Sequence, residues 1–188
     1  MRPCTRETTR SPARCSSTSL RTCWSGAGPA GPTRCSPEDF QRIYHHPQAV
    51  NREAAIEPPA TRQPGPAGMY ATAQWLRAAF SGLRWEVHHA VAHDDLVALH
   101  VTMSGRHTGD FVTYQPGTAT ADAAMPPTGK PFAVTQTHWF RTRDGMITEH
   151  WANRDDLAMA RQAGWVPPSP GFLLRAAIAK RRAQKRPA

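Results

Sequence analysis

Two histidines and a glutamine lie close together in one stretch of the chain and could move protons. Gln136 and His138 belong to a segment rich in β-branched and aromatic residues, 131–142, and His150 belongs to a similar segment, 146–153. An Asp-Gly pair between the two segments predicts a β-hairpin. Imidazole exchanges a proton near neutral pH and an amide forms hydrogen bonds, so this hairpin is the first candidate for a functional site.

The geometry of the turn decides whether the two imidazoles share a face of the hairpin. With Gly145 in the left-handed position of a bulged turn, Thr142 opposes Met146, and counting back along the strands pairs His138 with His150. A tight two-residue Asp-Gly turn would shift the pairing by one and separate the histidines. We favour the bulged turn. It predicts one face with Gln136, His138, Phe140, Thr148 and His150, and an opposite face with Trp139, Ile147, Glu149 and Trp151.

Such a face could abstract a proton next to a carbonyl group and hold the enolate that results. Imidazoles directly opposed on adjacent strands are about 5 Å apart at their Cβ atoms, and this proximity disfavours charging both. One can therefore act as a base while the other donates a hydrogen bond, and Gln136 adds an amide donor. We take His138 as the candidate base, with His150 and Gln136 orienting the substrate or stabilising the enolate.

A helix and two strands should precede the hairpin. Apolar residues recur at three- and four-residue steps over 69–80 and predict an amphipathic helix, whose Trp75 is a candidate for lining a pocket. Alternation over 83–92 and 96–104 predicts two strands, the first with Val87, His89 and Val91 on one face and His88 on the other.

The connections carry further expectations. Residues 115–130 show no regular pattern, which predicts a long loop that could act as a lid. After the hairpin, Asn153 or Asp155 can cap a helix that Gly164 ends. Another helix should begin at Ser36 and end near His46.

Two motifs carry a resemblance to a known family. The run RDGMITEHWANRDDLAMARQAGWVP, preceded by TMSGRHTG, is similar to the SnoaL-like polyketide and ester cyclases, and the similarity covers about residues 36–168. The resemblance implies a cone-shaped α+β domain of the nuclear-transport-factor-2-like kind, also described as an α+β barrel. In that fold a curved antiparallel or mixed β-sheet carries helices on its concave face. It also implies acid-base chemistry, without a cofactor, on a small and mostly apolar carbonyl compound.

One position departs from the family. In these cyclases an aspartate follows the Glu-His-Trp motif and works with a histidine on the preceding strand, whereas this chain has Ala152 after Trp151 and keeps the histidine as His138. A methyl group cannot move a proton. Two functions therefore remain open, an ester or polyketide cyclase that relies on His138 and His150, and a binding protein for small molecules that has lost the chemistry.

Further residues are candidates for binding the substrate. His107 belongs to the family-like motif, and Phe140 shares the predicted face of the histidines. The remaining candidates are Trp75, His88 and Asn51, and the expected rim of the pocket also includes His46, Arg52 and Glu53. No short histidine motif suggests a metal, so we expect neither a metal nor a cofactor.

The chain carries a formal charge of +9, and this charge is concentrated at its ends. Residues 1–35 hold six arginines and one glutamate, and residues 166–188 hold six basic residues and no acidic one, which leaves 11 basic and 13 acidic residues between them. We therefore expect a disordered basic tail (1–35), one folded domain (36–168) and a basic C-terminal tail (169–188). We do not expect the tails to bind nucleic acid or membranes, although basic tails as the functional part are a further alternative.

Composition also suggests a compartment and a partner. All four cysteines lie in the first tail and no apolar signal segment is present, so a cytoplasmic location is expected, with an organelle transit peptide as the alternative. Trp139, Ile147 and Trp151 predict an apolar outer face of the sheet that a second copy could cover in a homodimer. A short helix over 172–180 could cover it instead, docking through one side that carries Leu173, Leu174, Ala177 and Ile178.

Overall fold

A computed structural model describes residues 27–28, 31–32 and 45–185. The predicted start of a helix at Ser36 lies outside these residues, as does most of the tail expected over 1–35. The described elements are β1 (Ala27–Gly28), β2 (Gly31–Pro32), β3 (His45–Asn51), η1 (Ala54–Ile56), η2 (Pro59–Arg62), α3 (Pro66–Ala79), β4 (Phe80–His93), β5 (Leu96–His107), β6 (Phe111–Tyr114), β7 (Ala121–Met125), β8 (Pro131–Arg143), β9 (Met146–Arg154), α4 (Asp156–Ala163) and α5 (Pro170–Lys185).

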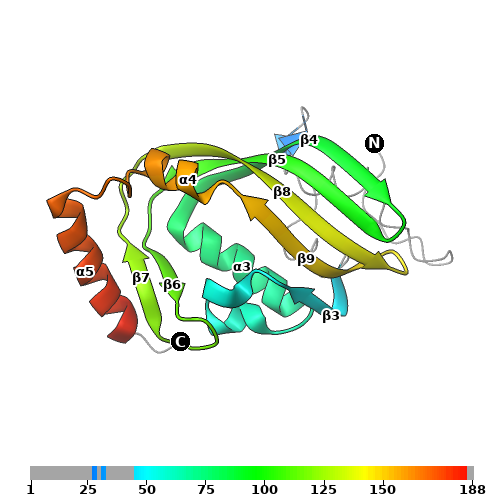
Figure 1. Ribbon diagram of the computed structural model, residues 1–188, viewed down its shortest axis with the longest axis horizontal. Coiled ribbons are helices and arrows are strands. Elements are labelled where there is room, and N and C mark those ends of the chain that lie inside the picture. Colours follow the sequence, from blue (N-terminus) through cyan, green and yellow to red (C-terminus); the bar gives the residue numbers. More distant parts are fainter. Residues whose placement is uncertain (1–26, 29–30, 33–44, 186–188) are drawn as a thin grey trace.

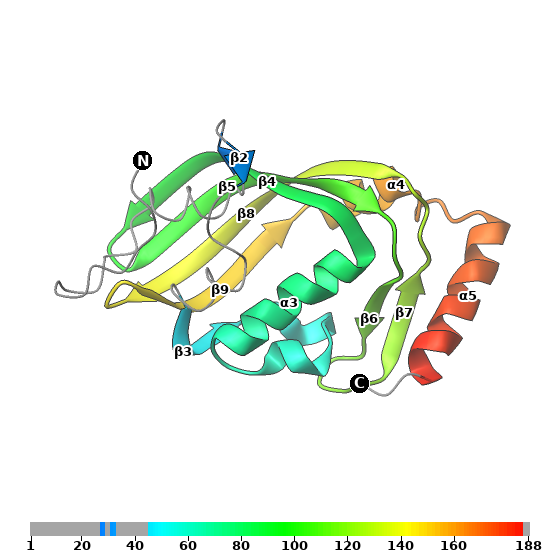
Figure 2. The ribbon, with the colours of Figure 1, turned by 180° about the vertical axis from the view of Figure 1, so that it is seen from behind.

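Five strands form the main sheet in the order β3-β9-β8-β5-β4. The pair β3–β9 is parallel and the other pairs are antiparallel, so the sheet is mixed. The sheet curves, and α3 lies along its concave side (Figures 1 and 2). This architecture confirms the predicted α+β class, a curved mixed sheet with a helix on its concave face. The barrel description is wrong in one respect, because the sheet is open and β3 and β4 are its edges.

The concave side of the sheet forms the core. Val97, Leu99, Val101 and Met103 alternate along β5 and are all buried, as the sequence pattern predicted. The first three meet Phe140 and other apolar side chains of the neighbouring strands, and Met103 packs with Phe132 and Val134. Burying a side chain of this size contributes roughly 1.5–3 kcal/mol, so this row fixes which face of every strand points inward.

Strand β4 departs from the predicted alternation at a bulge. The pairing with β5 shifts between Val87 and His89, and beyond the shift Ala90 lies opposite the buried Leu99. Ala90 therefore packs against the core, while Val91 is 64% exposed. The prediction that Val91 shares a face with Val87 is wrong, because one extra residue inverts the faces of everything beyond it.

The predicted long loop over 115–130 is also wrong in part. It contains β7, which pairs with β6 in a separate two-stranded sheet. Its sequence, ADAAM, lacks β-branched residues and gives little signal for a strand. The strand forms because β6 pairs with one side of it and α5 packs against it (Figure 1).

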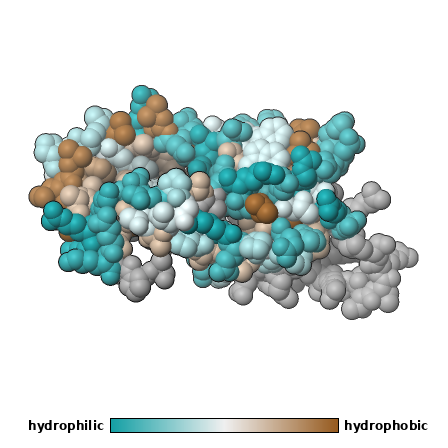
Figure 3. All heavy atoms as spheres, turned by 60° about the horizontal axis from the view of Figure 1, so that its bottom comes forward, coloured by the Kyte–Doolittle hydropathy of each residue, from teal (hydrophilic) through white to brown (hydrophobic). Residues whose placement is uncertain are grey.

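Helix α5 docks through a different side from the one expected. Phe172 and Ala179 are its buried residues, whereas Leu174 is 65% exposed and Ile178 is exposed as well. Figure 3 shows hydrophobic residues at the end of the molecule that carries α5, beside a hydrophilic group. The expectation that Leu174 and Ile178 face the body is therefore wrong, because Phe172 and Ala179 are buried in their place.

The last helix before α5 follows its predicted caps. The side chain of Asp155 accepts a hydrogen bond from the backbone nitrogen of Ala158 at 2.9 Å, and Gly164 ends α4 with a φ of 77°. These contacts satisfy backbone groups that a helix end leaves unpaired. In the part of the chain that is described, no helix has the length and apolar character needed to cross a membrane.

Candidate functional site

The turn of the β8–β9 hairpin is tight. Arg143 pairs directly with Met146, and both residues between them have positive φ, 51° for Asp144 and 78° for Gly145. These angles are typical of a two-residue type I′ turn. The predicted bulged turn is therefore wrong, and by itself this geometry would send the two histidines to opposite faces.

A bulge in β9 reverses that effect. Arg141 pairs with Glu149, but the next residue, Thr142, pairs with Ile147, so Thr148 is the extra residue. Ile147 consequently turns into the core and is fully buried, whereas the sequence pattern placed it on the outer face. The apolar outer face that suggested a homodimer is reduced to the two tryptophans, and the homodimer stays a prediction.

Beyond the bulge the two imidazoles lie on the same face of the hairpin. His138 is opposite Ala152 and His150 is opposite Phe140, so the two histidines are diagonal neighbours and not the direct pair that we expected. Their ring planes are nearly parallel, with an interplanar angle of 12° and centroids 5.2 Å apart. The Phe140 ring lies beside both imidazoles, with its centroid 5.0 Å from that of His150 and 6.4 Å from that of His138.

Hydrogen bonds join the histidines and the glutamine into a chain. The distance between His150 Nε2 and His138 Nδ1 is 2.9 Å, and that between His138 Nε2 and Gln136 Oε1 is also 2.9 Å. Gln136 donates from its Nε2 to the sulfur of Met103. Because Gln136 Oε1 can only accept, His138 donates from Nε2 and accepts at Nδ1, and His150 donates from Nε2. Donation therefore runs in one direction along the chain, from the N–H of His150 to His138 and from the N–H of His138 to Gln136.

Burial keeps both imidazoles neutral. Burial, assisted by the charge of Arg154, lowers the pKa of His138 to about 3. The pKa of His150 is also well below its usual value, because of burial first and then the proximity of His138, His45 and Arg154. Their residues are 7% and 8% exposed, so a small part of each remains accessible. At neutral pH each ring has one N–H to donate and one nitrogen to accept.

A second group of polar residues borders this wall at the edge of the sheet. Glu53 follows β3 and accepts a hydrogen bond from the backbone nitrogen of Ala152 at 2.7 Å through Oε1. Its other oxygen is 2.9 Å from the guanidinium of Arg154, which also lies 3.4 Å from Asp156. A carboxylate and a guanidinium therefore lie beside the residue that pairs with His138.

Glu57 is a buried acid in the same region. It is 2% exposed and accepts a hydrogen bond from the Thr72 hydroxyl at 2.6 Å. Asn51 donates to the same hydroxyl at 3.4 Å. Burial raises the pKa of Glu57, although the hydroxyls of Thr72 and Thr61 and the charge of Arg154 oppose the shift.

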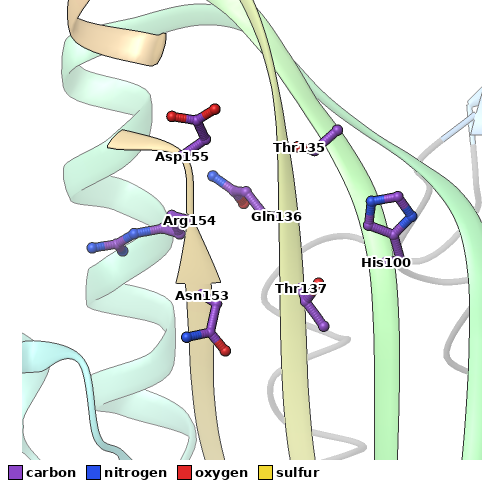
Figure 4. Close-up of a pocket in the computed structure, with 7 residues that line it drawn as sticks. All are labelled: His100, Thr135, Gln136, Thr137, Asn153, Arg154 and Asp155. Atoms are coloured by element: carbon purple, nitrogen blue, oxygen red, sulfur yellow. The ribbon is translucent and has the colours of Figure 1, made fainter. Parts of the chain in front are cut away.

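A polar pocket of about 360 Å³ lies at the C-terminal end of β9 (Figure 4). It is lined by His100, Thr135, Gln136, Thr137, Asn153, Arg154 and Asp155. Gln136 and Arg154 point toward the side of the sheet on which α3 lies, whereas His100 points away from it. Thr135, Thr137 and Asn153 lie on the face of the sheet opposite to His138, so the pocket opens mainly on that outer face and the histidine chain lies on the other side of the sheet.

Comparison with known proteins now identifies the family. The sequence model of the SnoaL-like polyketide cyclase family matches residues 34–163, more than half of the chain. The chain belongs to the SnoaL-like polyketide cyclase family. The resemblance found in the sequence motifs is therefore confirmed.

Two curated members of the SnoaL-like family resemble the chain. It is 31% identical over 131 residues to the aklanonic acid methyl ester cyclase DnrD of Streptomyces peucetius. The aligned residues cover 68% of this chain and 79% of DnrD. It is 32% identical over 110 residues to the aklanonic acid methyl ester cyclase DauD of Streptomyces sp. strain C5, with coverage of 56% and 60%.

Solved structures of the family share the fold. A SnoaL-like protein from Jannaschia sp. CCS1 superposes with a TM-score of 0.58 at 21% identity, over 86% of this chain and 99% of that one. IdmH from Streptomyces antibioticus, a proposed polyketide cyclase, gives a TM-score of 0.53 at 27% identity, over 78% and 94%. The fold is thus that of SnoaL-like proteins.

Three candidates named from the sequence lie away from the histidine chain. Trp75 donates to the carbonyl of Val112 at 2.8 Å and packs on Phe111. His107 is fully buried among aromatic rings, where Trp165 donates to its Nδ1 at 3.2 Å, and burial lowers its pKa.

His88 lies on the opposite face of the sheet. Its Nε2 is 2.7 Å from the Thr102 hydroxyl, and Thr102 follows the buried Val101 on β5. The structure therefore brings together Gln136, His138, His150 and Phe140, with Asn51 on the neighbouring strand opposite His150.

Sequence reasoning missed three residues of this SnoaL-like site. His45 is 1% exposed and close enough to His150 to affect its pKa. Glu57 and Arg154 are the others. Each could have been suspected only from its surroundings, such as the apolar and proline residues that flank Glu57. Within the described residues, no group of three or more His, Cys, Asp or Glu side chains is arranged to hold a metal.

Proposed function

We propose that this protein is an ester cyclase that closes a ring in a small, mostly apolar polyketide-like ester by acid-base chemistry. Membership of the SnoaL-like family and the similarity to two aklanonic acid methyl ester cyclases support the choice of substrate class. The observation that carries the proposal is the hydrogen-bonded chain from His150 through His138 to Gln136.

The neutral state of the histidines suits them to hold a developing negative charge. A group whose pKa is about 3 is a weak base, but its N–H donates a hydrogen bond without releasing the proton. In the proposed role, a substrate carbonyl oxygen replaces Gln136 Oε1 as the acceptor of the His138 N–H. His150 fixes the tautomer of His138, because its own N–H donates to Nδ1. Donors aimed at an enolate oxygen in a poorly solvated site lower the barrier to its formation.

The reaction proposed needs proton transfers and no change of oxidation state. A base removes a proton from the carbon beside the ester carbonyl, and the C–H electrons form an enolate. The enolate carbon then bonds to a ketone carbon of the same molecule, and the ketone oxygen takes up a proton. The product is an isomer of the substrate, so acid-base groups are sufficient and we propose no cofactor.

Turnover of aklanonic acid methyl ester tests this function. We expect wild-type protein to convert it, and His138→Ala to lower kcat by about 100-fold or more, the usual cost of removing one donor to an oxyanion. His93→Ala is the matched control, because the His93 side chain is exposed at the β4–β5 turn, 3.3 Å from the carboxylate of Asp94. Equal turnover by wild type and His138→Ala would refute the role of His138.

The alternative of a binding protein gives a different result. Tight binding of the ester by calorimetry, without conversion, would favour it over the cyclase. Ala152 is the residue that keeps this alternative open, because no proton-transfer group stands at that position.

A further inference from the structure

We propose that the carboxylate of Glu53 is the base of the cyclisation and that Arg154 positions it. This inference rests on the proposed function, because it names the group that accepts the proton in that reaction. His150 hydrogen-bonds to His138 and His138 to Gln136, so in their role as neutral donors neither accepts the proton that leaves the substrate carbon.

Glu53 is placed one strand away from His138. It accepts the Ala152 N–H at 2.7 Å, and Ala152 pairs directly with His138 across β8 and β9. From that hydrogen bond and standard bond lengths, the carboxylate oxygen lies within about 6 Å of the Ala152 Cβ. The methyl group is small, so the wall between the His138 imidazole and the Glu53 carboxylate carries no bulky side chain. A substrate spanning Ala152 would meet a hydrogen-bond donor on one side and a carboxylate on the other.

Arg154 holds the second oxygen of this carboxylate. The contact is 2.9 Å, and Arg154 pairs with Gln136 at the end of the hydrogen-bonded chain. With one oxygen bound to a backbone N–H and the other to a guanidinium, the Glu53 carboxylate has a fixed orientation. The side chain of Glu53 keeps an exposed fraction of 15%, so it remains accessible.

Glu57 is the nearest rival and is less suited to the task. It is 2% exposed, against 15% for the Glu53 side chain, so a substrate has less access to it. Its carboxylate accepts a hydrogen bond from the Thr72 hydroxyl at 2.6 Å. Thr72 belongs to α3, so these contacts tie the segment after β3 to the helix. We therefore assign Glu57 to support of the helix packing and Glu53 to the chemistry.

The proton balance of the step is complete. Glu53 takes the proton from the carbon beside the ester carbonyl, and the bonding electrons pass to the enolate held by His138. After the C–C bond forms, the protonated Glu53 returns its proton to the alkoxide formed from the ketone. The enzyme ends in its starting state and the reaction consumes no other reactant.

Glu53→Gln tests the assignment with aklanonic acid methyl ester as the probe. Glutamine keeps an oxygen for the Ala152 N–H, so the fold should be retained, which circular dichroism and the melting temperature check. We expect kcat to fall by about 100-fold or more while KM changes little, because the variant removes proton transfer and leaves the binding contacts. Asp156→Asn is the matched control. It removes the other carboxylate near Arg154, which is 69% exposed, and should leave kcat unchanged.

Rescue supplies a second, independent outcome. Ala152 pairs with His138 and lies beside Glu53. The double variant Glu53→Gln with Ala152→Asp should therefore have a kcat at least tenfold higher than that of Glu53→Gln alone. Conversion by Glu53→Gln at the wild-type rate would overturn the assignment even though the cyclase function stands. No conversion by wild type would instead refute the proposed function, and this inference with it. An equal loss of kcat in Asp156→Asn would also overturn the assignment, because the effect would then come from Arg154 and not from the base.

Discussion

Mild acid should destabilise the wild-type protein more than the His138→Gln variant. In the variant, the free energy of unfolding should fall less as the pH drops. The pKa of His138 is about 3 in the folded protein, against about 6.5 in an unfolded chain. At a pH between these two values, His138 is protonated in the unfolded chain and neutral in the folded protein. Stability therefore falls as the pH drops below about 6.5, and continues to fall until the pH reaches the folded pKa. Glutamine has no proton to bind and removes this contribution.

The size of the effect follows from the two pKa values. Integrated from pH 7 to pH 5, one such histidine costs the folded state about 2 kcal/mol. His150 acts in the same direction, and loses one cause of its lowered pKa when His138 is replaced. Glu57 acts in the opposite direction, because a raised carboxyl pKa favours the folded state as the pH falls. Glu57 is present in both proteins, so its contribution cancels in their difference.

Urea unfolding at pH 7 and pH 5, followed by circular dichroism, measures this difference. From pH 7 to pH 5, the free energy of unfolding should fall by about 2 kcal/mol more in the wild-type protein than in His138→Gln. This difference corresponds to about 1 M in the urea midpoint. His93→Gln is the control, because the His93 side chain is 88% exposed and should leave the pH dependence unchanged. Identical pH dependence in wild type and His138→Gln would show that the imidazole is not held neutral by burial, and the proposed donor role would fail.

Three further substitutions test the structure that positions the site, each by denaturant unfolding at pH 7. Phe140→Ala removes a fully buried ring that packs on His150 and should cost about 3–5 kcal/mol; a cost under about 1 kcal/mol would contradict its place in the core. Gly145→Ala puts a side chain at a φ of 78° and should cost about 1–2 kcal/mol, whereas no change would argue against the tight turn. Asp155→Ala removes the cap of α4 and should cost about 1 kcal/mol, with Asp156→Ala as the comparison that leaves the cap intact.

Much of the fold could be predicted because the signals were local. The alternation along β5 predicts which residues form the core, since the two faces of a strand differ in burial. Asp155 and Gly164 predict the ends of α4 because the chemistry of a helix cap needs only neighbouring residues. Strand β7 gave no such signal, because its stability comes from β6 and α5, which lie elsewhere in the sequence.

The polar partners at the edge of the sheet could not be predicted for the same physical reason. Glu53 meets Ala152 across 99 residues of sequence, and it does so because β3 joins the sheet in parallel beside β9. Two parallel strands that are far apart in sequence are not joined by a short turn, so no turn motif predicts their pairing. Glu53 was a candidate for the rim of the pocket, but its contact with Arg154 required the topology to be known.

The meeting of His138 and His150 depends on two irregularities that compensate for each other. The tight turn at Gly145 shifts the register by one residue, which alone would separate the imidazoles. The bulge at Thr148 shifts it by one more and returns them to a common face, now as diagonal neighbours that can hydrogen-bond at 2.9 Å. The same bulge turns Ile147 into the core, where a fully buried side chain gains about 2 kcal/mol and offsets the ladder contacts that the bulge disrupts. Burial of one isoleucine therefore holds the register on which the hydrogen-bonded chain depends, although that isoleucine takes no part in the proposed chemistry.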